Sequence, residues 1–68
     1  MKVTVIHRPS GEEEEVEIPE GSTILAVLRA AGIPPDVTVC MMDGKPVPVD
    51  RQMKEGESFE AITVVSGG

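Results

Sequence analysis

Few residues in this 68-residue chain carry groups that could do covalent chemistry. Cys40 is the single cysteine and His7 the single histidine. One cysteine forms no intramolecular disulfide, and one histidine without further thiols makes a poor metal site. The chain also contains no P-loop, GxGxxG, HExxH or nucleophile-elbow motif. The sequence therefore does not predict an enzyme, and it predicts no metal site and no tightly bound cofactor.

The last two residues, Gly67 and Gly68, are the other feature with a possible chemical use. Because neither has a Cβ atom, they form the thinnest and most adaptable tail that a polypeptide can offer. The alternative is a frayed glycine terminus with no function. At average glycine usage a terminal pair arises by chance in roughly one chain in 200, so the pair alone is a weak signal.

Composition and charge exclude several classes of protein. A net charge of −6 and a single aromatic residue, Phe59, disfavour direct nucleic-acid binding. The apolar runs are far shorter than the ~20 residues of a membrane helix. With one cysteine and no signal peptide, we expect a cytoplasmic protein. The length allows one small domain over residues 1–68.

The first 18 residues predict a β-hairpin. Residues 2–7 are β-branched and roughly alternating, which is typical of a strand. Pro9 and Gly11 then mark a turn, because proline presets one dihedral angle and glycine permits a positive φ. The acidic run Glu12 to Glu15 leads into Val16-Glu17-Ile18, where acidic and apolar side chains alternate, so Val16 and Ile18 should face the core.

The next segment carries the start, face and stop signals of an α-helix. Ser22 or Thr23 can cap its first turn, and Gly32 followed by Pro34 and Pro35 ends it. Its apolar residues at helical spacing are Ile24, Val27, Leu28 and Ala31.

The rest of the chain predicts two strands and a weaker third. Residues 37–42 form an apolar strand, followed by a tight turn at Asp43-Gly44. Residues 46–49 contain alternating prolines and form an edge strand at best. After a polar stretch anchored by Met53, residues 58–65 form the last strand. This order predicts an α+β fold, a β-grasp roll in which one main helix covers a mixed sheet of four to five strands. We expect the first and last strands to lie side by side in its middle.

Strand alternation assigns side chains to the two faces of this sheet. The predicted core between helix and sheet comprises Val3, Val5, Val16, Ile18, Ile24, Leu28, Cys40, Met42, Phe59 and Ala61. This makes Cys40 a small core residue rather than a redox thiol. On the face without a helix, apolar side chains could form a partner-docking patch or be ordinary scattered surface residues. The residues concerned are Val39, Met41, Ile62 and Val64.

Two polar features have simple interpretations. The run Glu12 to Glu15 could dock on a basic partner, but a solvated hairpin edge is the favoured interpretation. His7 ends the first strand and is interpreted as a surface residue without an assigned role.

A β-grasp chain that ends in Gly-Gly resembles the ubiquitin-like sulfur carriers. These include the thiamin-biosynthesis sulfur carrier, the small subunit of molybdopterin synthase, and the archaeal and ubiquitin-related small modifier proteins. Residues 19–24, followed by Val27-Leu28, resemble the start of the family's helix. Asp43-Gly44 stands where the family usually has Asn-Gly, and Gly56-Glu57 stands where Gly-Asp is commoner. Residues 50–57 look closest to the ubiquitin-related and archaeal modifiers.

The resemblance implies that a ubiquitin-activating-type enzyme adenylates the Gly68 carboxylate with ATP and Mg²⁺. A sulfur donor, such as a cysteine desulfurase or a rhodanese-like protein, would then convert it to a thiocarboxylate for a sulfur-accepting synthase. Gly67, which has no side chain, would keep the tail narrow next to the reacting group. Ser66 would be part of an extended to flexible tail over residues 64–68. Outward Met41, Ile62, Val64 and Val39 would dock the partner, and the free protein would be a monomer.

Three functions stay open on the sequence. The protein could be a sulfur carrier, a modifier that joins Gly68 to lysines of other proteins, or an interaction domain whose glycines are inert. As a sulfur carrier it could serve molybdopterin or tungsten cofactor synthesis, tRNA thiolation or thiamin synthesis. Residues 50–57 favour tRNA thiolation or molybdopterin over thiamin.

Overall fold

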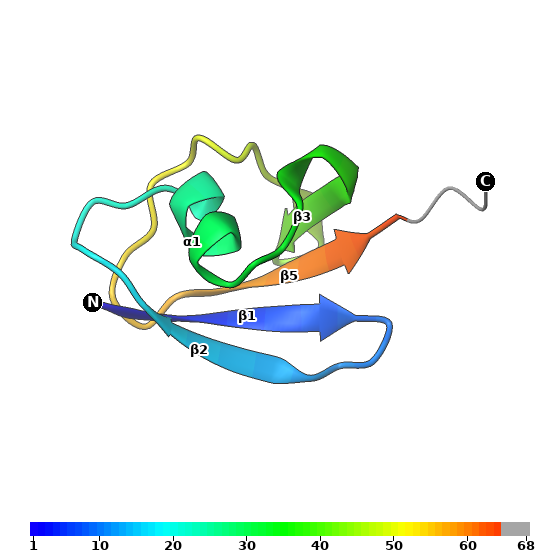
Figure 1. Cartoon of the computed structure of the whole chain (residues 1–68), viewed down its shortest axis with the longest axis horizontal. Coiled ribbons are helices and arrows are strands. Elements are labelled where there is room, and N and C mark those ends of the chain that lie inside the picture. Colours follow the sequence, from blue (N-terminus) through cyan, green and yellow to red (C-terminus); the bar gives the residue numbers. More distant parts are fainter. Residues whose placement is uncertain (65–68) are drawn as a thin grey trace.

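The secondary structure follows the predicted order, with one short helix in addition (Figure 1). The computed structural model describes residues 1–64. The elements in this part are β1 (Lys2–Arg8), β2 (Glu13–Glu17), α1 (Ile24–Ala30), the 3₁₀ helix η1 (Pro35–Val37), β3 (Thr38–Met42), β4 (Lys45–Pro46) and β5 (Ser58–Thr63).

The strands described form one mixed sheet in the order β2-β1-β5-β3-β4. β1 and β5 lie side by side in the centre and run parallel, with Val5 opposite Phe59 (Figure 1). β2 and β3 pair antiparallel with β1 and β5 respectively, and Cys40 lies opposite Ala61. The predicted central pairing of the first and last strands and the α+β, β-grasp class are therefore confirmed.

The α1 helix begins and ends where its sequence signals predict. Thr23 is the N-cap, and its Oγ1 accepts a hydrogen bond from the backbone N–H of Ala26 at 3.3 Å. Gly32, just past the C-cap Ala31, has a φ of 72°, which a residue with a side chain adopts at a cost. The apolar side of α1 packs on one face of the sheet, and Ile24, Val27 and Leu28 are buried.

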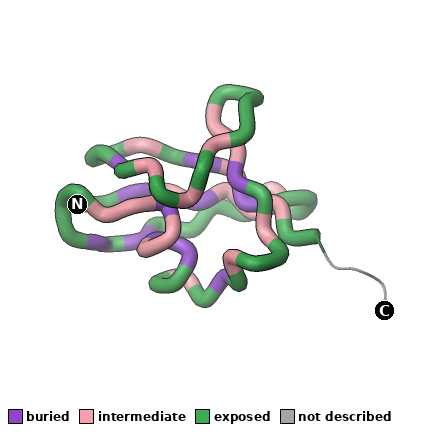
Figure 2. Tube along the Cα trace, turned by 90° about the horizontal axis from the view of Figure 1, so that it is seen from above, coloured by how far each residue is buried: buried purple, intermediate pink, exposed green. Residues whose placement is uncertain are grey.

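Twelve apolar residues form the core between α1 and the sheet. They are Val3, Val5, Val16, Ile18, Ile24, Val27, Leu28, Ile33, Cys40, Met53, Phe59 and Ala61. Exposed residues lie in the turns around them and along most of β2 (Figure 2). Met42 is a correction: it is half-buried and packs against this core from outside, because it ends β3 beside the exposed β3–β4 turn. Ile33, which follows the helix, is a core residue that the periodicity did not single out.

The segment between β4 and β5 is held by contacts that a strand pattern does not encode. β4 spans only Lys45–Pro46, shorter than the predicted edge strand. Beyond it, Leu25 donates its backbone N–H to the Val49 carbonyl at 2.8 Å, and Met53 donates to Ser22 at 2.8 Å. The Met53 side chain is buried, which agrees with its predicted role as an anchor.

Strand ends differ slightly from the prediction. β3 begins at Thr38 because the Pro34-Pro35 pair leads into η1 instead of an extended segment. The described part of the last strand ends at Thr63, and Val65 lies outside the described residues.

Candidate docking face and tail

The sheet has one face packed against α1 and one face turned away from it, here called the outer face. Along β5, Phe59 and Ala61 are buried against α1, so alternation places Glu60 and Ile62 on the outer face. Residues paired directly across strands share a face, and this register puts Val39 beside Ile62. The outer face therefore carries the apolar pair Val39 and Ile62 next to the charged side chain of Glu60.

Two cross-strand rows make up the middle of the outer face. One row runs from Ile6 on β1 through Glu60 on β5 to Met41 on β3. The next row contains Ile62 and Val39. Val39 is 45% exposed, whereas Met41 and Ile62 are half-buried. The structure thus brings together three of the residues that the sequence assigned to a docking face, and their docking role stays a prediction.

An ion pair crosses this apolar surface. The Nε of Arg8, on β1, lies 2.7 Å from the Oε2 of Glu60 on β5. Both side chains are partly exposed. Because water screens such a pair, its contribution to stability is small in the isolated protein. Covering the face with a partner would remove that screening and strengthen the interaction.

Val64 marks the point at which the described chain leaves the sheet. Its backbone N–H donates to the carbonyl oxygen of Val37 at 2.7 Å, and its side chain is 54% exposed. Ser66, Gly67 and Gly68, to which the sequence assigned the tail chemistry, lie outside the described residues. Their roles stay predictions, but the last described residue is next to the apolar rows of the outer face.

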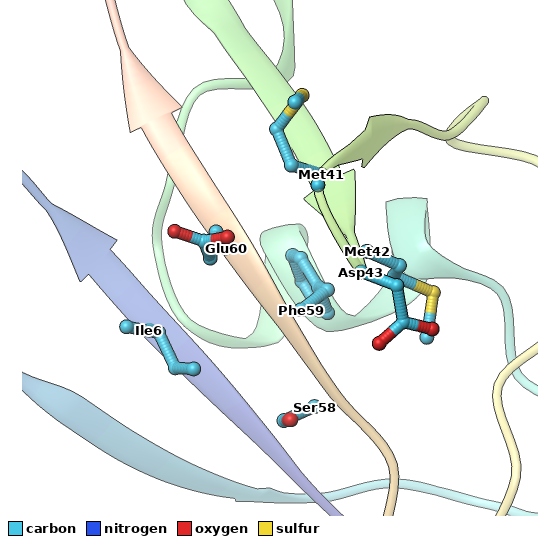
Figure 3. Close-up of a pocket in the computed structure, with 8 residues that line it drawn as sticks. Ile6, Met41, Met42, Asp43, Ser58, Phe59 and Glu60 are labelled. Atoms are coloured by element: carbon cyan, nitrogen blue, oxygen red, sulfur yellow. The ribbon is translucent and has the colours of Figure 1, made fainter.

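A hollow of about 250 Å³ opens on the outer face, between the β3–β4 turn and the start of β5 (Figure 3). It is lined by Ile6, Met41, Met42, Asp43, Gly44, Ser58, Phe59 and Glu60. Asp43 and Gly44 occupy the turn with φ angles of 50° and 76°, as expected for a tight hairpin turn. The lining of the hollow is more polar than apolar, and it includes two carboxylates and a hydroxyl.

The glutamates of β2 divide between the two sides of the sheet. Glu13 lies opposite Ile6 and Glu15 opposite Thr4, which places both on the outer-face side. Glu14 lies on the other side, and its Oε1 is 3.0 Å from Nε2 of His7. These glutamates are exposed, as the solvated-edge interpretation requires.

Cys40 faces the core. Its side chain is buried, and this burial raises the pKa of the thiol. A thiol in such a site is seldom ionised at neutral pH, so it is a weak nucleophile. Within residues 1–64, no cluster of histidine, cysteine, aspartate and glutamate has an arrangement that could hold a metal ion. Nor is any described helix long and apolar enough to cross a membrane.

A sequence model of the small archaeal modifier protein 2 family matches residues 1–65. The chain belongs to this family. Small archaeal modifiers are ubiquitin-like β-grasp proteins that act as modifiers or sulfur carriers rather than as catalysts. It is also similar to an uncharacterized protein of Archaeoglobus fulgidus, with 39% identity over 57 residues, which cover 84% of this chain and 82% of the relative.

Sequence reasoning missed the hollow and the Arg8–Glu60 pair. The turn signal at Asp43-Gly44 was visible, but nothing local indicates that this turn lies beside Ser58. That proximity arises from the pairing of β3 with β5, two strands far apart in the sequence. Likewise, Arg8 and Glu60 meet because β1 and β5 run parallel in the centre of the sheet.

Proposed function

We propose that this protein is a sulfur carrier whose Gly68 carboxylate is adenylated and then converted to a thiocarboxylate. A free carboxylate is a poor acyl donor, because its leaving group would be oxide. Transfer of AMP from ATP releases pyrophosphate and provides a good leaving group, which the activating enzyme stabilises with Mg²⁺ and basic groups. A donor persulfide then displaces AMP, and a second thiol cleaves the S–S bond. The products are the thiocarboxylate and a donor disulfide.

One observation carries this proposal: in a chain of this family, Val64 follows the central strand β5 and stands next to an apolar pair on the outer face. The central strand β5 leads to Val64, and Gly67 and Gly68 stand three and four residues after it in the sequence. Here the apolar outer-face residues Val39 and Ile62 stand beside the start of the tail. An enzyme that accepts the thin tail would thus find an apolar surface next to it, and such surfaces are typical of partner sites.

The proposal implies three partners in a cytoplasmic setting. They are a ubiquitin-activating-type adenylating enzyme, a sulfur donor such as a cysteine desulfurase or rhodanese-like protein, and a sulfur-accepting synthase. ATP and Mg²⁺ are used by the enzyme and not held by the carrier, which is a monomer when free. The resemblance of residues 50–57 favours a synthase of tRNA thiolation or of molybdopterin over one of thiamin.

The second candidate is conjugation, and the family's description as modifiers favours it. After the same adenylation, the Gly68 carbonyl would form an isopeptide bond with a lysine of another protein. The two functions share the tail and the enzyme and differ only in the nucleophile. The product therefore distinguishes them.

Mass spectrometry of the product tests the proposal. The protein is incubated with the adenylating enzyme of the same organism, ATP, Mg²⁺ and a persulfide donor. We expect a mass gain that matches replacement of one oxygen by sulfur, confined to the C-terminal peptide. Deletion of Gly68, or one residue added after it, should abolish the gain, and Gly67→Val should nearly do so. One residue added before Met1 is the matched control and should leave the gain intact.

Two results would contradict the sulfur-carrier function. Equal thiolation of the parent and of the variant without Gly68 would show that the tail is not the reacting group. A ladder of lysine-linked adducts with no thiocarboxylate would show that the protein is a modifier instead.

A further inference from the structure

The backbone of Val64, the last residue that the structure describes, is held by a hydrogen bond to the η1 helix. Its N–H donates to the carbonyl oxygen of Val37 at 2.7 Å. This bond continues the antiparallel pairing of β3 with β5 by one step beyond Thr38 and Thr63. Val37 belongs to η1 and not to β3, so the short helix supplies a backbone contact beyond the end of β5.

The η1 turn holds the Val37 carbonyl in place through two prolines and Thr38. The rings of Pro34 and Pro35 restrict their φ angles. The backbone N–H of Thr38 donates to the carbonyl oxygen of Pro35. The side-chain Oγ1 of Thr38 donates to the carbonyl oxygen of Pro34 at 2.6 Å. The direction of the Val37 carbonyl is therefore set by a turn with little conformational freedom.

The contact between η1 and Val64 lies outside the core. The side chains of Val37 and Val64 are 44% and 54% exposed, and Thr38 is half-buried. None of these three residues belongs to the core cluster within residues 1–64. Loss of an exposed backbone hydrogen bond costs little stability, because water replaces the lost partner. The contact is therefore a feature of the place where the tail begins more than a support of the fold.

The place where the tail begins determines how Gly68 reaches an active site. Four residues follow Val64, and a chain of this length spans at most about 14 Å when fully extended. Release of Val64 from the sheet would move the start of the tail back by one residue, or about 3.5 Å. It would also add a residue whose backbone must be ordered when the carboxylate meets ATP, and this ordering costs free energy. A fixed start therefore favours the reaction.

We propose that η1 is a positioning element for the reacting end of the chain. The Val37 carbonyl holds Val64, and Thr38 holds the turn that presents this carbonyl. The adenylating enzyme then receives a tail whose starting point is fixed. Val37 and Thr38 act through Val64 and not on the reacting atoms, so they are positioning residues. This inference rests on the proposed function, because it assigns a role in the adenylation of Gly68.

A matched pair of substitutions at Thr38 tests the turn. Thr38→Val keeps the branched shape of the side chain and removes the hydroxyl that donates to Pro34. Thr38→Ser keeps the hydroxyl and loses only a methyl group. The values of kcat and of KM for the carrier are measured by exchange of pyrophosphate into ATP, with the adenylating enzyme of the same organism. Hydrogen exchange of the Val64 amide is followed by NMR.

We expect Thr38→Val to lower kcat at least about threefold, with KM within about twofold of the parent value. A looser start brings the carboxylate into place less often, but it leaves the surface that binds the enzyme unchanged. The Val64 amide should also exchange faster in this variant. Thr38→Ser should restore kcat and amide exchange. A purely structural role would instead reduce the folded fraction of the carrier, which raises its apparent KM and leaves kcat unchanged.

A backbone ester removes the contact directly. The chain can be assembled by chemical ligation at Cys40, so that the segment after it carries the ester. Replacement of the Val64 N–H by oxygen removes the donor to Val37 and changes no side chain. The same replacement at Gly56, whose N–H donates to the carbonyl of Lys2 at 2.9 Å, is the control at the opposite end of the sheet. We expect kcat to fall at least about threefold for the Val64 ester and to stay within about twofold for the Gly56 ester.

The inference is overturned if the Val64 ester keeps the kcat of the parent, or if the Gly56 ester loses as much. A change confined to KM in Thr38→Val overturns it as well, and the Val64 ester decides the matter if Thr38→Val does not fold. In all these cases the parent is still adenylated, and the proposed function stands. If the parent itself is not adenylated, the proposed function and this inference fail together.

Discussion

Val39 and Ile62 are direct cross-strand partners on β3 and β5, and both lie on the sheet face turned away from α1. Their row is next to Val64, whose N–H forms a 2.7 Å hydrogen bond with the carbonyl of Val37. Residues on this face do not hold the core together, so a substitution here should separate partner binding from folding. This separation is the basis of the first prediction.

Ile62→Glu should leave the fold intact and weaken activation by the adenylating enzyme. A glutamate on a strand surface keeps its charge in water when the protein is free, but it must be desolvated when an apolar partner covers it. We expect at least a tenfold loss of kcat/KM for adenylation, measured by exchange of pyrophosphate into ATP. The circular dichroism spectrum should match that of the parent.

Ala30→Glu is the control for this charge. Ala30 is exposed on α1, on the other side of the sheet, so the added carboxylate should change adenylation little. An unfolded Ile62→Glu protein would show that the side chain belongs to the core. Unchanged adenylation would show that the outer face does not dock this enzyme.

Leu28→Ala should destabilise the protein strongly. Leu28 is fully buried on the apolar side of α1, and truncation of such a residue leaves a cavity in a small core. The expected cost is ~2–5 kcal/mol, a large part of the stability of a domain of this size. Urea unfolding followed by circular dichroism measures it. Leu25→Ala, at a half-buried position of the same helix, is the control and should cost clearly less; equal losses would mean that the helix face is wrongly assigned.

The sequence predicted the fold because local signals and periodicity agreed. Thr23 marks the start of the helix and Gly32 its end, and the apolar residues between these two positions are the ones that α1 buries. Met42 shows where the method fails. Alternation makes it a core residue, but it is the last residue of β3, beside the exposed β3–β4 turn, and is only half-buried. Alternation fixes the face of a residue but not its depth.

The candidate site was only partly predictable for a similar reason. Alternation alone placed Val39 and Ile62 on one face, because each assignment needs just its own strand. The hollow on the outer face joins Asp43 to Glu60 and Ser58, so it depends on the register between β3 and β5 and on the course of a turn. No pattern within one segment encodes such a relation.

Glu57→Gln should lower the melting temperature at neutral pH. Glu57 accepts hydrogen bonds from Arg51 and from the backbone N–H of Lys54, and the first of these is the main reason that its pKa is lowered. A carboxyl group with a lowered pKa in the folded state stabilises the protein above its unfolded pKa. This stabilisation is lost as the pH falls through the folded pKa.

The difference in melting temperature between the parent and Glu57→Gln should therefore be largest near pH 7 and should shrink in acid. Differential scanning calorimetry from pH 7 to about pH 3 measures it. Glu20→Gln, at an exposed position, is the control and should follow the parent. A difference that stays constant with pH would show that the charge of Glu57 does not matter.

Cys40 should take no part in sulfur transfer, although it is the single thiol of the chain. Its side chain is 3% exposed, and burial raises its pKa, so the nucleophilic thiolate is disfavoured in the folded protein. Alkylation of the native thiol at pH 8 should then require local opening and be at least about tenfold slower than in denaturant. The variant Cys40→Ala with Val39→Cys moves the thiol to a neighbouring position that is 45% exposed in the parent. The thiol of this variant should be alkylated rapidly in the native state, and this result would show that burial and not the strand sequence protects Cys40.

Cys40→Ala alone should still gain the C-terminal sulfur, since the proposed route runs through the Gly68 carboxylate. A persulfide found on Cys40, or loss of the sulfur gain in Cys40→Ala with its fold retained, would place the sulfur chemistry inside the sheet and not on the tail.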